Sequence, residues 1–150
     1  MTVTITPEKP NTPDAIKLID ELEGTLAPYY PDESRHGYSV DKLIQQGVAF
    51  FVVRVDGKPA GCGGVQLYDD YAELKRMYVN PDYRGHGLAK QLLKHLAQYS
   101  QDHEITILRL ETGIHQHEAL GLYEQFGFVR REHFGEYQPD PNSVFMEKTL

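Results

Sequence analysis

A glycine-rich turn between a strand and a helix limits most strongly what this chain can fold into. Residues 72–79 read as a strand, residues 80–83 break it, and Arg84-Gly85-His86-Gly87 leads directly into the next segment. That segment is a predicted helix, because its apolar residues recur on one face: Leu88, Leu92, Leu93, Leu96 and Ala97. Glycines at such a junction let several backbone N–H groups point to one place, where the helix dipole adds positive potential. The pattern indicates a phosphate or pyrophosphate site, to which Arg84 can add a charged fork.

Two other phosphate-binding loops fit this turn less well. The dinucleotide-binding pattern needs glycine or alanine three residues after the second glycine, where this chain has Lys90. A Walker A loop ends in Gly-Lys-Ser/Thr, which the chain lacks. Taken alone, the turn is equally compatible with two glycines that only make a tight turn and cap a helix.

The N-terminal part predicts one strand and two helices around a loop. Residues 2–6 alternate β-branched residues and suit an edge strand. Thr12 reads as the N-cap of a helix with proline in its first turn, and Gly24 reads as the residue that ends this helix. Residues 28–38 are rich in turn residues and aromatics and read as a loop. A short helix is predicted over residues 39–47.

The following segments predict a meander and then alternating helices and strands. Two β-rich runs, residues 48–55 and 59–68, flank Asp56-Gly57, a strong hairpin signal, and the strand at 72–79 follows a second turn. The remaining elements are a polar break at 100–104, a strand at 106–112, a helix at 117–126 ended by Gly127, and strands at 128–134 and 143–149. No internal repeat or linker interrupts this order, so residues 1–150 read as a single α+β domain.

Charge and composition exclude several functional classes. The chain carries 22 acidic and 15 basic side chains, and its formal net charge of −7 argues against a general nucleic-acid-binding surface. No run approaches the roughly 18 apolar residues of a membrane span, and the start lacks the features of a secretory signal. The one cysteine, Cys62, cannot form an internal disulfide. We therefore expect a cytoplasmic protein without a membrane or nucleic-acid partner, whose acidic field favours a cationic or amine substrate.

Two motifs in the correct order make the chain resemble the GCN5-related N-acetyltransferase (GNAT) superfamily. Its signature is Gln/Arg-x-x-Gly-x-Gly/Ala, and Arg84-Gly85-His86-Gly87-Leu88-Ala89 satisfies every fixed position. The run Ala119-Leu120-Gly121-Leu122-Tyr123-Glu124-Gln125-Phe126-Gly127-Phe128 is similar to the family's Ala-x-x-Leu-Tyr-x-x-x-Gly-Phe helix and strand. The resemblance covers nearly the whole chain. It implies the acyl-CoA N-acyltransferase fold, with three α/β/α layers, a mixed, mostly antiparallel, splayed sheet of about seven strands, and about four helices.

The resemblance also implies acetyl-CoA as cosubstrate, wedged where the strand at 72–79 parts from the next strand. The pyrophosphate would be held by the main-chain amides of Arg84, Gly85, His86, Gly87, Leu88 and Ala89. The backbone of Met77, Tyr78 and Val79 would pair with the pantetheine arm and could polarise the thioester carbonyl. Gln116 stands where the family often has asparagine, and its longer amide could still contact CoA.

Two residues take catalytic roles if the resemblance holds. Tyr123 occupies the family's general-acid position, although a tyrosine on an amphipathic helix can equally be a core residue. Glu73 matches a general-base position found in some members, and strand alternation puts it on the same face as Met77 and Val79. The alternative for Glu73 is a solvated carboxylate paired with Lys75. Glu111, on the next strand, is a second candidate for the base.

The remaining reactive residue types give no metal or nucleophile. His115 and His117 have no third ligand in view, so we expect no metal site. His86 occupies a variable position of the turn. Cys62 reads as a small packing residue, because direct attack by an amine needs no cysteine nucleophile.

The acceptor should be recognised by three loops, at residues 29–38, 68–71 and 134–142. Their acidic residues favour a cation, and their tyrosines offer flat apolar walls. Arg35 and His36 could instead receive a carboxylate, which suits an amino-acid-like substrate. All of these residues could equally be solvated loop tips.

The sequence therefore predicts an enzyme that transfers acetyl from acetyl-CoA to a primary amine of a small molecule or amino-acid-like substrate, by direct attack. The alternatives are a non-catalytic acyl-CoA-binding module, which the presence of Tyr123 argues against, and a protein N-acetyltransferase. Transfer to tRNA fits the acidic charge poorly. Homodimers are common in the family, so a homodimer is an option, although no segment identifies an interface.

Overall fold

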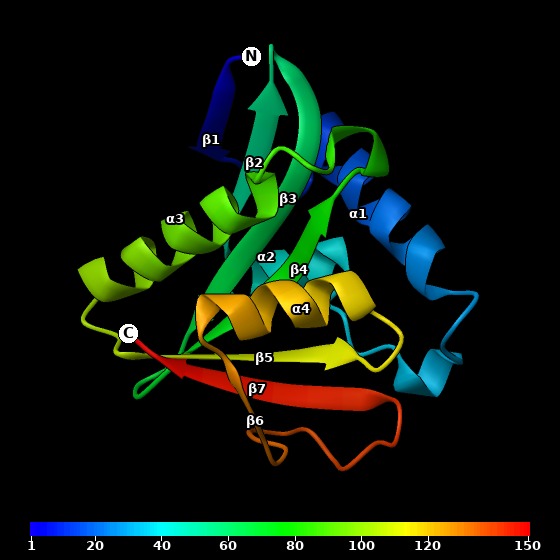
Figure 1. Cartoon of the computed structure of the whole chain (residues 1–150), viewed down its shortest axis with the longest axis vertical. Coiled ribbons are helices and arrows are strands. Elements are labelled where there is room, and N and C mark those ends of the chain that lie inside the picture. Colours follow the sequence, from blue (N-terminus) through cyan, green and yellow to red (C-terminus); the bar gives the residue numbers. More distant parts are fainter.

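The computed structural model describes all residues, 1–150, as one open seven-stranded sheet flanked by helices (Figure 1). The strands are Val3–Pro7 (β1), Ala49–Val55 (β2), Lys58–Leu67 (β3), Ala72–Val79 (β4), Ile107–Gly113 (β5), Val129–Arg131 (β6) and Ser143–Thr149 (β7). The helices are Pro13–Leu26 (α1), Val40–Gln45 (α2), Leu88–Asp102 (α3) and His117–Phe126 (α4), with short 3-10 turns at Asp32–Ser34 (η1) and Pro81–Tyr83 (η2). None of the helices is long and apolar enough to cross a membrane.

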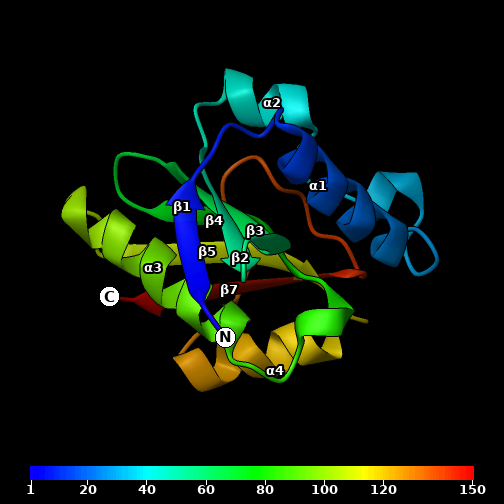
Figure 2. The same cartoon turned by 90° about the horizontal axis from the view of Figure 1, so that it is seen from above.

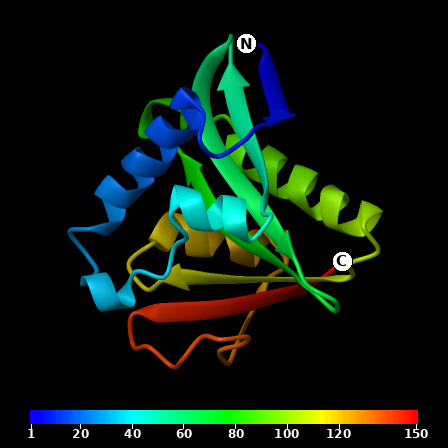
Figure 3. The ribbon, with the colours of Figure 1, turned by 180° about the vertical axis from the view of Figure 1, so that it is seen from behind.

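The order of the strands is β1-β2-β3-β4-β5-β7-β6, and every neighbouring pair is antiparallel except β4 and β5. These two run parallel and share only two register pairs, Ala72 with Leu108 and Glu73 with Arg109. Beyond Glu73 the strands diverge, and the sheet opens between them (Figures 1 and 3). The predicted splayed, mostly antiparallel sheet is confirmed.

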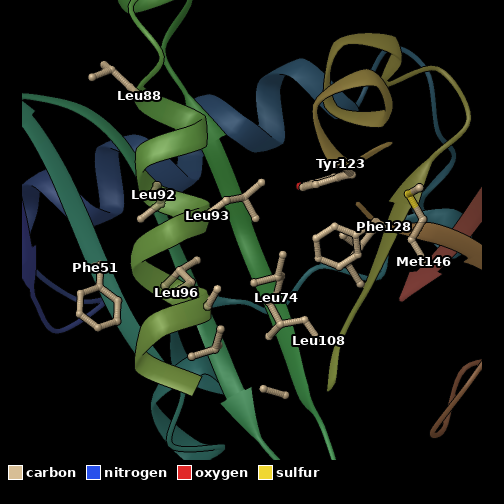
Figure 4. Close-up of a cluster of buried hydrophobic side chains, with 14 of the residues drawn as sticks. Phe51, Leu74, Leu88, Leu92, Leu93, Leu96, Leu108, Tyr123, Phe128 and Met146 are labelled. Atoms are coloured by element: carbon tan, nitrogen blue, oxygen red, sulfur yellow. The ribbon is translucent and has the colours of Figure 1, made fainter. Parts of the chain in front are cut away.

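Helices cover both faces of the sheet and give the predicted three layers (Figure 2). α3 and α4 lie on one face over a core cluster of 20 buried residues, to which Leu92, Leu93 and Leu96 of α3 contribute side chains that are 0% exposed (Figure 4). α1 and α2 lie on the other face over a cluster of 10 residues that includes Leu18 and Leu43. Because burial of a leucine stabilises by about 1.5–3 kcal/mol, these apolar faces fix both helical layers on the sheet.

Local signals in the sequence explain several element boundaries. The Thr12 hydroxyl caps α1 by accepting a hydrogen bond from the Ala15 N–H at 3.2 Å, and Ser39 caps α2 in the same way. Asp56 and Gly57 have φ angles of 50° and 81°, as the predicted two-residue hairpin turn between β2 and β3 requires.

Three predicted boundaries were wrong. α1 does not end at Gly24 but continues to Leu26, which packs against the smaller core cluster, and this contact outweighs the roughly 1 kcal/mol that a glycine costs inside a helix. α3 continues through the predicted polar break to Asp102, because Ser100 is buried and its hydroxyl donates to the Leu96 carbonyl at 2.9 Å. β6 is limited to Val129–Arg131, the three residues that pair with β7.

Candidate active site

The opening between β4 and β5 leaves one edge of β4 without a strand partner. Residues 74–79 pair with β3 on one side only, because β5 has already turned away. The backbone N–H and C=O groups on the free edge can therefore pair with an extended chain that carries amide groups. This edge contains Met77, Tyr78 and Val79, the residues predicted to hold a pantetheine arm.

The glycine turn, residues 84–89, ends beside this edge, and only its first backbone donor is used, because the Arg84 N–H donates to the Pro81 carbonyl at 3.3 Å. Gly85 and Gly87 have φ angles of 84° and 73°, a region that side chains disfavour, and α3 begins at Leu88 without a side-chain cap. The N–H groups of residues 85–90 make no hydrogen bond within the protein. Six free donors at the N-terminus of a 15-residue helix suit a pyrophosphate. The Arg84 side chain is half-exposed, and its Nη1 lies 3.4 Å from Oε2 of Glu118.

A bulge in β4 changes the direction of its side chains. Between neighbouring register pairs, the single residue Gly63 of β3 faces two residues of β4, Arg76 and Met77. Arg76 has a φ angle of 55°, which is uncommon for a residue other than glycine. A bulge of this kind re-aims the following side chains and the backbone groups next to them.

Because of this bulge, the prediction that Glu73 shares a face with Met77 and Val79 was wrong. Met77 and Val79 pack against the core on the α3 side of the sheet. Glu73 lies on the opposite face, where it is 2% exposed. Its Oε2 accepts hydrogen bonds from the Tyr137 hydroxyl at 2.6 Å and from the Lys75 ammonium at 2.8 Å. The pairing with Lys75 was anticipated, but the carboxylate is buried rather than solvated.

Tyr123 lies on α4 and faces a cavity of about 130 Å³ at the opening, called here the small cavity. The small cavity is lined by Leu22, Leu26, Tyr30, Ser34, Arg35, His36, Gly37, Leu74, Arg76, Met77, Leu110, Glu111, Thr112, Gly113, Gln116, Ala119 and Tyr123. The Tyr123 ring packs edge-to-face on Phe128, and its hydroxyl points from α4 toward β4 (Figure 4). Burial, reinforced by the nearby Glu111, raises the pKa of Tyr123. The phenol is therefore a neutral proton donor at physiological pH, and the protein supplies no hydrogen-bond partner for its hydroxyl.

Glu111, on β5, shares the small cavity with Tyr123. Its Oε2 accepts a hydrogen bond from the Ser143 hydroxyl at 2.8 Å. Burial raises the pKa of Glu111, which makes this carboxylate a stronger base than an exposed glutamate. The structure thus brings Tyr123 together with Glu111, whereas Glu73 lines a second cavity.

That second cavity, called here the large cavity, measures about 850 Å³ and lies on the α2 side of the sheet. It meets the small cavity at Arg35, His36 and Gly37, which line both. Its walls are Glu33, Arg35, His36, Gly37, Tyr38, Lys42, Gln46, Gln66, Tyr68, Tyr71, Glu73, Lys75, Gly135, Glu136, Tyr137, Gln138, Pro139 and Asp140. These residues come from the three loops predicted to recognise the acceptor, from β3 and β4, and from α2 and its C-cap, which supply Lys42 and Gln46.

Gln116 lies immediately before α4 and lines the small cavity. Its Oε1 accepts a hydrogen bond from the Tyr30 hydroxyl at 3.2 Å, and the same hydroxyl accepts one from the His115 N–H at 2.9 Å. Tyr30 was predicted to be one of the tyrosine walls of an acceptor-recognition loop. Its 5% exposure and its contact with Gly113 instead connect the loop before η1 to the loop after β5.

Cys62, His115 and His117, which were also singled out, line neither cavity. Cys62 belongs to the core cluster beneath α1, and burial raises the pKa of its thiol to about 12, as suits a packing residue. His115 and His117 flank the start of α4, and no group of three or more His, Cys, Asp or Glu residues gathers as a metal site would require.

No pattern in the sequence predicts one charged group at the small cavity. Arg76 comes from the β4 bulge, and a carboxylate of α1, Glu23, lies between it and Arg35. Helical spacing puts Glu23 on the polar side of α1, so neither residue pattern predicts that the two meet. Only the position of the bulge brings them together.

Comparison with known proteins agrees with this geometry. A family model described as the acetyltransferase (GNAT) family matches residues 17–128. An IAA acetyltransferase of Azospirillum brasilense is 38% identical over 150 residues, covering 99% of this chain and 98% of its own. The [ribosomal protein bS18]-alanine N-acetyltransferase of Escherichia coli is 30% identical over 142 residues, covering 87% of this chain and 96% of its own.

Solved structures show the same fold. One crystal structure is that of a Klebsiella pneumoniae protein to which an acyl-CoA N-acyltransferase function has been assigned. Its sequence is 38% identical, and it superposes with a TM-score of 0.85 over 99% of this chain and 98% of its own. The PaiA N-acetyltransferase of Thermoplasma acidophilum, in complex with coenzyme A, is 21% identical with a TM-score of 0.81 over 100% of both chains. The family model, the relatives and the open sheet with its free glycine turn agree, and the chain belongs to the acetyltransferase (GNAT) family as an acyl-CoA-dependent acetyltransferase.

Proposed function

We propose that this acetyltransferase moves an acetyl group from acetyl-CoA to the primary amine of a small molecule by direct attack of the amine. The observation that supports this most is the placement of a neutral phenol, Tyr123, and a raised-pKa carboxylate, Glu111, in one cavity at the opening of the sheet. The cavity lies beside the free edge of β4, so a chain paired with that edge would reach it.

The residues that would hold acetyl-CoA fit its chemistry. The free N–H groups of the glycine turn match the two phosphates of the pyrophosphate, and the free β4 edge matches the amides of pantetheine. Gln116 would add its amide at the cavity wall. Acetyl-CoA supplies the acetyl group as a thioester, whose carbon–sulfur bond breaks as the carbon–nitrogen bond forms.

The chain's own groups divide the proton transfers between them. An alkylammonium titrates near ~10.4 and has no lone pair, so a base must remove one proton before attack. Glu111 is suited to this role, directly or through water, and Glu73 is the alternative on the other side of the sheet. A backbone N–H of β4 would donate to the carbonyl oxygen, and the Tyr123 hydroxyl would protonate the departing sulfur.

The test is release of free CoA thiol in the presence of a panel of amines, polyamines and amino acids. Glu111→Gln and Glu73→Gln are compared on the best acceptor, with acetyl-CoA affinity measured by calorimetry for each. We expect Glu111→Gln to lower kcat by about a hundredfold or more and Glu73→Gln to act mainly on KM. Acetyl-CoA binding without turnover on any acceptor would instead indicate a non-catalytic acyl-CoA-binding module.

One relative supports a second candidate, transfer to the N-terminal amine of a protein. The Escherichia coli relative is named for alanine acetylation of a ribosomal protein. Short peptides with N-terminal alanine therefore belong in the panel. A kcat/KM for peptides above that for every free amine would favour this second function.

A further inference from the structure

One wall of the small cavity carries two arginines. Arg76 projects from the β4 bulge with a side chain that is only 5% exposed, and Arg35 follows η1 with a side chain that is 24% exposed. Both arginines line the small cavity together with Tyr123.

The partly buried negative charge in contact with these arginines is smaller than their positive charge. Glu23 of α1 lies between them, with Oε2 at 3.4 Å from Nη1 of Arg35 and Oε1 bonded to Nη2 of Arg76. The only other carboxylate in contact, Asp32, pairs with Arg35 but is 91% exposed, so solvent screens it. One partly buried carboxylate is thus shared by two guanidinium groups.

Each guanidinium also keeps a donor that the protein does not use. The Nε of Arg35 is the one buried side-chain nitrogen or oxygen atom in the structure without a hydrogen-bond partner. Arg76 donates from Nε to the Tyr38 carbonyl and from Nη2 to Glu23, which leaves Nη1 free. A buried donor without a partner is unfavourable, so a small rearrangement of Arg35 that brings in an acceptor is favoured.

A group of the opposite charge lines the same cavity. Glu111 is there with Tyr123, so an ammonium group can approach the carboxylate while an anion approaches the arginines. His36 takes no part in the anion site, because its Nε2 lies 3.1 Å from Asp140 and is already engaged. A zwitterion whose charges are a few atoms apart suits a cavity lined by both kinds of charge.

We propose that the acceptor carries a carboxylate next to its primary amine, as an amino acid does, and that Arg35 binds this carboxylate with support from Arg76. The body of the acceptor then enters the large cavity through the shared residues Arg35 and Gly37. There Tyr38 and Tyr137 provide aromatic walls. This inference rests on the proposed amine acetylation and narrows its substrate class.

The test compares amino acids with the amines that lack only the carboxylate: phenylalanine with phenethylamine, tyrosine with tyramine, and leucine with isoamylamine. In the wild type, we expect kcat/KM to be higher for the amino acid of at least one pair. Arg35→Gln should lower the ratio of kcat/KM between that amino acid and its matched amine by about tenfold to a hundredfold, as loss of a charged hydrogen bond implies. Arg35→Lys should recover part of the ratio, and Arg130→Gln, an exposed arginine on β6, should leave the ratio unchanged.

Two outcomes would overturn the inference while amine acetylation stands. One is a wild type that prefers the amine in all three pairs. The other is an Arg35→Gln variant that loses activity equally on both members of a pair, which would show that Arg35 only fixes the loop through Glu23. If no amine is acetylated, amine acetylation itself fails. In that case, calorimetry with N-acetylphenylalanine and N-acetylphenethylamine on the CoA-bound protein tests the carboxylate site by itself. Equal affinities for the two compounds would contradict such a site.

Discussion

Tyr123 lines the small cavity and is only 6% exposed, and its hydroxyl has no hydrogen-bond partner within the protein. Burial that keeps the phenol protonated also leaves its proton available to an incoming group. At this scale, the environment of a single side chain decides whether the residue packs or reacts. The same residue type on α3, Tyr99, packs its ring against Phe51 and His103.

Replacing Tyr123 by phenylalanine removes the proton donor and retains the packing against Phe128. We expect kcat to fall by about a hundredfold to ten-thousandfold, while the affinity for acetyl-CoA stays the same. Steady-state kinetics and calorimetry measure the two quantities, with Tyr99→Phe as the matched control. Activity of Tyr123→Phe within twofold of the wild type would exclude the residue as the acid.

Glu111 gives a stability prediction that does not depend on substrate. Burial raises its pKa, so the folded protein holds this proton more tightly than the unfolded chain does. The stability contributed by the protonated form is present below the usual glutamate pKa of about 4.3 and is lost as pH rises through the raised value. Glu111→Gln should therefore become more stable relative to the wild type as pH rises through this window.

Urea unfolding between pH 4 and pH 8 measures the difference in the free energy of unfolding between Glu111→Gln and the wild type. Glu124→Gln, at an exposed position of α4, serves as the control and should show little pH dependence relative to the wild type. A difference between Glu111→Gln and the wild type that does not change with pH would mean that the carboxylate is solvated.

At the scale of the elements, the proposed acetyl-CoA site depends on the backbone at the start of α3. The glycine turn holds the N–H groups of residues 85–90 free only because Gly85 and Gly87 take positive φ angles. At both positions an added Cβ would meet open space, so the cost of a side chain there comes from the backbone rather than from a clash.

Gly85→Ala should therefore weaken acetyl-CoA binding by about tenfold and lower stability by about 1–2 kcal/mol. Gly57→Ala is a matched control, because Gly57 has a φ angle of 81°, open space at its Cβ position, and a place in the β2–β3 hairpin away from the turn. We expect the control to lose similar stability and to keep its affinity for acetyl-CoA. Equal affinities in both variants would contradict a pyrophosphate site at the turn.

The elements that the sequence predicted well are those with local causes. The Asp56-Gly57 hairpin, the bounds of β4 and the bounds of α4 follow from turn residues, alternation and Gly127. The β4 bulge has no such signal, because it depends on how β3 pairs with β4 across the sheet. For that reason Glu73 was assigned to the wrong face, and the meeting of Arg76 with Glu23 was not predicted.

At the scale of the whole molecule, the two core clusters support opposite faces of a sheet that is joined at β4 and β5 by only two register pairs. The larger cluster contains residues from both sides of the opening, such as Leu74 of β4 and Leu108 of β5, so packing holds the two halves of the sheet together while the opening persists without a strand to fill it. The free β4 edge and the glycine turn lie along this opening (Figure 1). The small cavity lies there too, because Leu74 and Met77 of β4 and Leu110 of β5 line it.

Hydrogen exchange with and without acetyl-CoA tests most directly whether this opening holds the cosubstrate. In the free protein, the N–H groups of residues 85–90 and those on the free edge of residues 74–79 lack partners and should exchange fast. We predict that acetyl-CoA slows exchange in both segments and leaves β1 and β2, at the far edge of the sheet, unchanged. Binding of acetyl-CoA without protection of either segment would contradict the account.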